Sequence, residues 1–281
     1  MFIESAFLKL PELMLSNADS AGRVEAMVVQ KMVTALQMEL NSRSIPFSYS
    51  RVVVEKPYQQ RTKSGTLYRA DLLFDAQGCV PGTSRLYEYG FREKHWLEAK
   101  SFFSRGKVAA AKTQNVGRIV KDMIRLCLLP EELQGKIRQN SRYLLLIFDK
   151  NPSKYLTLKS RAWLNNLFEQ PSPKIIIDLC EEKQSLLKPI TRGSSINATI
   201  ELNCSKLQFE PEPNARPPIY WGYLLRIDSF SLQINGISCH CVGGIGEYWG
   251  SKTIQNYVAA KEEFINLLKI DSESSDEYNI A

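Results

Sequence analysis

Apolar residues recur at two different spacings along the first two-thirds of the chain. A helical spacing of three to four residues runs over 23–40, 107–129 and 160–168, and it predicts three helices that each bury one face. Short apolar or β-branched runs predict strands; they cover 48–54, 68–74, 95–103, 143–148 and 175–179. The run 143–148 is continuously apolar, which is typical of a strand buried on both faces, and the run 175–179 predicts a further buried strand.

The order of these elements predicts the fold class. One helix is followed by three strands, and strands then alternate with helices, so we expect an α/β fold with a central mixed β-sheet flanked by helices. The polar stretch 56–66 contains Gly65 and predicts a long loop. The strands on either side of this loop should form an antiparallel pair.

The character of the sequence changes after about residue 190. Two further strands are expected at 197–209 and 220–234, and Asn235-Gly236 directly after them is a strong hairpin signal. An amphipathic pattern over 253–268 predicts a final helix. We therefore divide the chain into a core at 1–190, a β-rich extension or subdomain at 191–270 and an acidic tail at 271–281. Whether the second part is a separate domain or extends the main sheet is left open.

Length and charge narrow the classes of function. The chain has 281 residues and a formal net charge of +6, although its last eleven residues carry four acids and no Lys or Arg. The more basic remainder favours a polyanionic partner. The longest apolar run, Tyr143 to Phe148, is far shorter than the ~20 residues that cross a bilayer. The N-terminus lacks the basic leader of a signal peptide, so we expect a cytoplasmic location and no membrane partner. The acidic composition of the tail predicts that it is disordered.

The six cysteines do not form a zinc signature. No two of them are spaced as CxxC, and Cys239-His240-Cys241 has no second ligand pair nearby. Alternation along a strand would also point His240 away from its two neighbours. Half-buried strand cysteines explain this triplet better than a zinc site does.

Charged residues interrupt two of the predicted strands, and they are the main chemical signal in this sequence. Asp71 lies in one strand, and Glu98-Ala99-Lys100 lies in the next. Side chains alternate along a strand, so Glu98 and Lys100 should point to the same face. Buried charges are costly unless they are paired or bind a metal. Two carboxylates and an ammonium group on one sheet surface suit metal-dependent hydrolysis of a phosphodiester.

A Glu-x-Lys triplet alone is weak evidence, because about one is expected by chance in a chain of this composition. Glu181-Glu182-Lys183, with Asp178 before it, is a second example. We reject it because the triplet follows the apolar strand and its aspartate is too near in sequence to lie on a neighbouring strand. The alternative for Glu98 and Lys100 is a surface ion pair on an edge strand, which would contribute little stability.

The layout from about residue 23 to 148 resembles the PD-(D/E)XK nuclease superfamily, which includes many restriction endonucleases. Asp71 matches the first acid of the family motif, Glu98 the second and Lys100 the lysine, while Ala70 stands where the motif has proline. The resemblance implies a restriction-endonuclease-like core in which the carboxylates and the backbone carbonyl of Ala99 hold a metal ion. Some members add an acid from the first helix, a role that Glu25 would fill.

The resemblance implies an Mg²⁺-dependent endonuclease that hydrolyses DNA, with Mn²⁺ able to substitute, in restriction, phage defence or mobile-element processing. Asp71 and Glu98 would bind the ion through oxygen, and the metal would lower the pKa of a bound water. Lys100 would orient that water and stabilise charge in the transition state. The partner could also be RNA, although no RNA-binding signature is present. A non-catalytic nucleic-acid-binding or assembly subunit is the alternative, and a homodimer or a larger defence or mobile-element complex is compatible with either.

Basic and amide residues near the predicted site are candidates for contacts with nucleic-acid phosphates. They lie on the hairpin and at the start of the helix that follows the Glu98 strand. A solvated helix face is an equally good interpretation for most of them. The candidates are Arg69, Arg105, Lys107, Lys112, Gln114 and Arg118.

Overall fold

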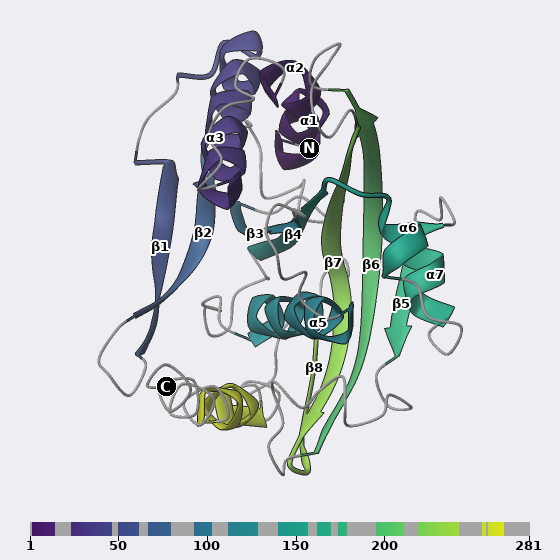
Figure 1. The fold of residues 1–281 in the computed structure, drawn as a ribbon. Helices are drawn as coiled ribbons and strands as arrows, with labels where there is room; N and C mark the ends of the chain where they lie inside the picture. The colour runs from purple at the N-terminus through teal and green to yellow at the C-terminus, as the bar shows by residue number, and fades with distance from the viewer. Residues whose placement is uncertain are drawn as a thin grey trace, which may run out of the picture.

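Eight strands of the computed structural model pair into one mixed sheet (Figure 1). The structure describes residues 2–14, 24–46, 50–61, 67–79, 93–102, 112–128, 140–156, 162–169, 174–178, 195–210, 219–241, 255–256 and 258–266. Seven of the strands follow the order β1-β2-β3-β4-β7-β6-β5, and β8 pairs with β7. Most neighbouring pairs are antiparallel, and β3 and β4 are parallel. The prediction of a mixed sheet with flanking helices is therefore confirmed.

The first half of the sheet is built from a meander and one crossover. β1 (Val52–Arg61), β2 (Leu67–Asp75) and β3 (Lys94–Phe102) are successively antiparallel. The chain then passes through helix α5 (Lys112–Leu128) and returns in β4 (Asn140–Phe148), parallel to β3. All nine residues of β4 are buried, as its continuous apolar run predicted.

The strands after residue 190 extend the same sheet. β7 (Tyr220–Ile234) pairs antiparallel with β4 and also with β6 (Ile196–Phe209). The Asn235-Gly236 hairpin is confirmed, because both residues have positive φ, 47° and 84°, and they connect β7 to β8 (Ile237–Cys241). Helical residues at 258–266 agree with the predicted final helix.

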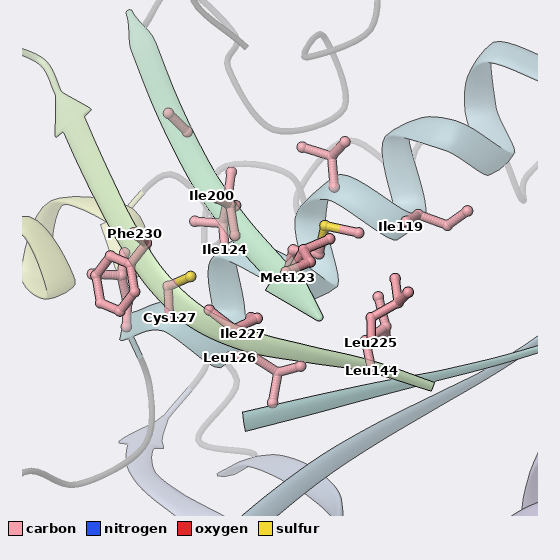
Figure 2. Close-up of a cluster of buried hydrophobic side chains, with 14 of the residues drawn as sticks. Ile119, Met123, Ile124, Leu126, Cys127, Leu144, Ile200, Leu225, Ile227 and Phe230 are labelled. Atoms are coloured by element: carbon pink, nitrogen blue, oxygen red, sulfur yellow. The ribbon is translucent and has the colours of Figure 1, made fainter. Parts of the chain in front are cut away.

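Helices cover both faces of the sheet. One face packs against α1 (Phe2–Leu8), α2 (Leu10–Met14) and α3 (Val24–Ser42), and we call it the α3 face. The other, the α5 face, packs against α5, α7 (Ala162–Phe168) and the 258–266 helix. A short helix, α6 (Pro152–Tyr155), follows β4. Figure 2 shows apolar side chains of α5 beside those of β4, β6 and β7, and the labelled set includes Ile119, Met123, Leu144, Ile200 and Leu225.

Two expectations were wrong, and two helices were not predicted. β1 continues as a strand to Arg61, so the loop predicted for 56–66 is wrong over its first half. β5 (Lys174–Asp178) pairs only with β6 at the edge of the sheet, and 51% of Ile176 is exposed, so this strand is not buried on both faces. Helices α1 and α2 were not predicted. The acidic tail at 271–281 lies outside the described residues.

Cys79, Cys127 and Cys239 are buried free thiols, and Cys204 is partly buried. No helix within the described ranges is both long enough and apolar enough to cross a membrane.

Candidate active site

The alternation of side chains shifts by one residue in both β1 and β2, at the point where Asp71 lies. Leu72 of β2 packs on the α3 face, whereas Ala70, two residues earlier, packs on the α5 face. In β1, Val52 and Tyr58 are an even number of residues apart and yet lie on opposite faces. Val54 pairs with Leu72 and Lys56 pairs with Ala70 across the two strands, so Glu55 lies opposite Asp71.

Glu55 lies at this shift. Its φ of 51° is unusual for a residue other than glycine. The β1–β2 register is unchanged across Glu55, and a further irregularity follows between Pro57 and Arg61.

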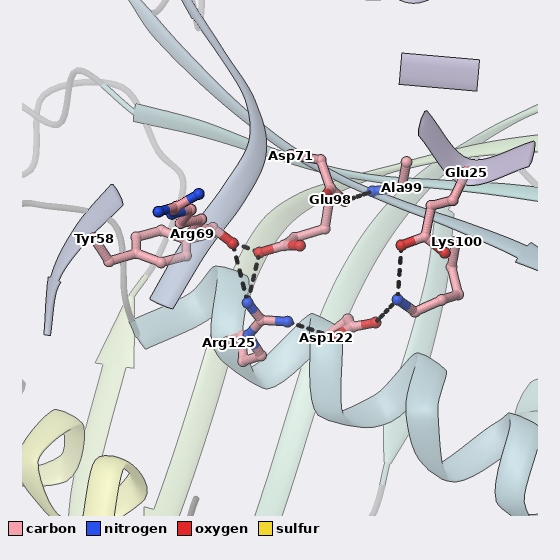
Figure 3. A network of polar contacts seen from close by, with 9 residues as sticks. All are labelled: Glu25, Tyr58, Arg69, Asp71, Glu98, Ala99, Lys100, Asp122 and Arg125. Carbon is pink, nitrogen blue, oxygen red and sulfur yellow. Dashed lines mark hydrogen bonds and ion pairs between the residues drawn. The ribbon is translucent and has the colours of Figure 1, made fainter. Parts of the chain in front are cut away.

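Asp71 points across to β3, where the ladder between β2 and β3 ends. The last paired residues are Leu72 and Leu97. Two residues further along β3, the N–H of Ala99 donates to Oδ2 of Asp71 at 2.6 Å (Figure 3). The carboxylate thus takes the place of a strand carbonyl as the acceptor for Ala99. This hydrogen bond holds Asp71 beside the backbone that carries Glu98 and Lys100.

Glu98 is buried on the α5 face, with 3% of its surface exposed. The Tyr58 hydroxyl donates to Glu98 Oε1 at 2.8 Å, and Arg125 Nη2 lies 3.3 Å from the same oxygen. Tyr58 in turn stacks on Trp96. Burial raises the pKa of Glu98 to about 8, and the charges of Asp122 and Asp71 add to the rise, although Arg125 opposes it.

Lys100 lies between two carboxylates from two helices. Its Nζ is 3.2 Å from Glu25 Oε1 of α3 and 3.7 Å from Asp122 Oδ2 of α5. Burial alone would lower the pKa of Lys100, but the charges of Asp122 and Glu25 raise it above its ordinary value. The lysine is therefore held as an ammonium ion.

Asp71 has a shifted pKa as well. Burial raises the pKa of Asp71, the hydrogen bond from Ala99 lowers it, and the charges of Glu25 and Asp122 raise it. The pKa of Asp71 is raised overall, and burial is the largest cause. These positions exclude a surface ion pair on an edge strand, because β3 lies between β2 and β4 and Glu98 is buried.

Three residues of this cluster were not predicted from the sequence: Tyr58, Asp122 and Arg125. Arg125 Nη1 donates to Asp122 Oδ1 at 3.0 Å, and Nη2 donates to the carbonyl of Arg69 at 3.2 Å. A signal was present, because Arg118, Asp122 and Arg125 are four and three residues apart within this helix. That spacing places them on one face of the helix.

The proposed phosphate-binding residues are only partly described. The Arg69 guanidinium is exposed and pairs with Glu55 at 2.8 Å on the hairpin. Arg118 is exposed on α5. Lys112 and Gln114 are helical residues of α5 whose side chains are outside the described part of the structure. Arg105 and Lys107 also lie outside the described residues, as does the rejected triplet Glu181-Glu182-Lys183.

The oxygen donors of this cluster suit a hard divalent cation. Asp71 and Glu98 lie with Glu25 and Asp122 around two cations, Lys100 and Arg125 (Figure 3), so the described charges leave an excess of two carboxylates. Mg²⁺ typically binds one or two carboxylates and keeps several waters. Within the described ranges, no three His, Cys, Asp or Glu side chains are arranged to hold a metal. Asp71 and Glu98 are two carboxylates, the number that Mg²⁺ can use in this way.

No protein-family model matches this chain, and searches of curated proteins and of solved structures also gave no match.

Proposed function

We propose that this protein is an Mg²⁺-dependent nuclease that hydrolyses DNA phosphodiester bonds and has a PD-(D/E)XK, restriction-endonuclease-like core. The observation that carries the proposal is the convergence of Asp71 and Glu98, from neighbouring strands, with Lys100. The chain order α3-β1-β2-β3-α5-β4 follows the order of that family's core. Glu25 of α3, the candidate acid from the helix that precedes β1, contacts Lys100.

The roles follow from the geometry. Asp71 and Glu98 would hold the cation, and the cation supplies a bound water of lowered pKa and neutralises charge on the phosphate. Lys100 orients the nucleophilic water and stabilises the negative charge that develops in the transition state. Glu25 and Asp122 keep Lys100 protonated and in position. Tyr58 and Arg125 restrict the orientation of the Glu98 carboxylate.

A plasmid cleavage assay with matched variants tests this proposal. Purified protein is incubated with supercoiled DNA and Mg²⁺, and Asp71→Asn and Lys100→Ala are compared with the wild type. Each substitution should lower the rate by about 100-fold or more, as loss of a group that stabilises developing charge does.

The chain offers a control for each variant. Asp75, also on β2, accepts a backbone hydrogen bond from Gln77, so Asp75→Asn controls for Asp71→Asn. Lys9 lies 3.2 Å from Glu39 and is 28% exposed, compared with 3.2 Å and 26% for Lys100, so Lys9→Ala controls for Lys100→Ala. Both controls should cleave like the wild type.

The same assay separates the alternatives. Cleavage that survives both active-site substitutions rules out this site. DNA binding without cleavage by the wild type supports the non-catalytic binding subunit. Parallel reactions with single-stranded and double-stranded RNA distinguish a ribonuclease from a deoxyribonuclease.

A further inference from the structure

Arg125 is anchored at the centre of the candidate site by three elements. Its guanidinium contacts Glu98 of β3, Asp122 of its own helix and the carbonyl of Arg69 in β2. The side chain is 17% exposed. Arg125 forms an ion pair with Glu98, whereas the Lys100 ammonium is paired with Glu25 and Asp122.

The hydrogen bonding of Arg125 is incomplete in this arrangement. Arg125 Nε is buried and has no hydrogen-bond partner among the described residues. A buried donor without a partner is unfavourable. Glu98 Oε1, in contrast, accepts a hydrogen bond from the Tyr58 hydroxyl and forms an ion pair with Arg125. Arg125 therefore balances the charge of the Glu98 carboxylate, but one of its own N–H donors is left without a hydrogen bond to any described residue.

A divalent cation bound to Glu98 would lie close to the Arg125 guanidinium, because both would contact the same carboxylate. Two positive charges that close together repel strongly in a buried site. Binding both positive groups to Glu98 at the same time therefore adds little favourable free energy. We propose that Arg125 and the divalent cation are alternative partners of Glu98, so that Arg125 sets how tightly the site binds metal. This inference rests on the proposed function, because it takes Glu98 to be a metal ligand.

The test measures binding of Mn²⁺ to the full-length protein without nucleic acid, by electron paramagnetic resonance of the free ion. Arg125→Gln removes the competing charge and should tighten Mn²⁺ binding by about tenfold, within the range of ordinary coupling between two sites. Arg125→Lys keeps a positive charge, so its affinity for Mn²⁺ should stay within about threefold of the wild-type affinity. A change of that size is smaller than the weakest coupling that is typical between two sites.

Arg226→Gln is the matched control. Arg226 is also a partly buried arginine that bridges two acids, Glu4 and Asp228, but it is anchored at α1 rather than at the candidate site. Its substitution should leave Mn²⁺ affinity unchanged. A change as large as that of Arg125→Gln would show a general effect of losing positive charge and would overturn the inference.

A second measurement does not depend on a variant that loses its partner. In wild-type protein, the side-chain ¹⁵N resonances of Arg125, assigned with Arg125→Lys, should shift when Mg²⁺ is added. Resonances that stay fixed while Mg²⁺ binds overturn the inference.

The outcomes also separate this inference from the proposed function. Equal Mn²⁺ affinity in the wild type and Arg125→Gln, with binding lost in Asp71→Asn, overturns the inference and leaves the nuclease proposal standing. No Mn²⁺ binding by any of these proteins overturns both.

Discussion

The stability of the protein should fall as the pH rises from about 4.5 to about 8, because Glu98 ionises inside the site. In an unfolded chain the pKa of this carboxyl is 4.5, and burial raises it to about 8 in the folded protein. A change of this size is equivalent to roughly 4–5 kcal/mol at pH 8. The full amount is an upper limit, since neighbouring charges readjust when Glu98 ionises.

The direction follows from proton binding. Between the two pKa values, folded Glu98 holds a proton that the unfolded chain has lost, so the free energy of unfolding decreases with rising pH. The contribution is fully present below pH 4.5 and is lost as the pH approaches 8. Asp71, whose pKa is also raised, changes stability in the same direction.

The assay is urea unfolding of wild-type protein and Glu98→Gln at pH 5 and pH 8. Glutamine resembles the protonated carboxyl, so the two proteins should have similar stability at pH 5. At pH 8 the variant should be more stable by as much as roughly 4 kcal/mol. A difference in unfolding free energy that is the same at both pH values would refute this reasoning.

Glu39 provides a control of opposite sign. Burial would raise its pKa, but hydrogen bonds from Arg43 and Lys9 lower the pKa below the ordinary value. The stability that it contributes is present above an unfolded pKa of 4.5 and is lost as the pH falls through the folded value. Glu39→Gln should therefore be less stable than the wild type at pH 8, with a smaller deficit at acid pH.

Three further results are expected. Arg125→Ala should cost about 1–3 kcal/mol in urea unfolding at pH 8, because it removes the hydrogen bonds to Asp122 and to the carbonyl of Arg69, while Glu98 takes up a proton; a cost below that of Arg226→Ala would contradict this. Gly236→Ala should cost about 1 kcal/mol, because φ at this turn is 84°, and an unchanged melting temperature would exclude that strain. Mg²⁺ at one hundred times its dissociation constant should stabilise the wild type by about 2.7 kcal/mol, and equal stabilisation of Asp71→Asn would remove Asp71 as a ligand.

The periodicity of the sequence predicted much of the sheet. The alternation over 95–103 placed Glu98 and Lys100 on one face, and they do share the α5 face with Asp122 and Arg125. An apolar run, in contrast, identified the buried strand β4 but overestimated the burial of β5. The run in β4 is uninterrupted and lies between two neighbouring strands, whereas the run at β5 contains Asp178 and this strand pairs on one side.

The position of Asp71 relative to β3 could not be predicted from local sequence. The strand opposite Asp71 is irregular there, since Glu55 has positive φ, and glutamate has no intrinsic preference for that conformation. Asp122 and Arg125 were missed for a related reason. Their spacing shows that they share a helix face, but only tertiary packing determines that this face meets Glu98.

The most direct test of the account is the anomalous scattering of crystals grown with Mn²⁺. We expect a peak about 2.1 Å from carboxylate oxygens of Asp71 and Glu98, a distance typical of a small divalent ion, with the Arg125 guanidinium no longer against Glu98. Well-ordered Asp71 and Glu98 without a peak between them, at a Mn²⁺ concentration that supports cleavage, would contradict the proposed metal site.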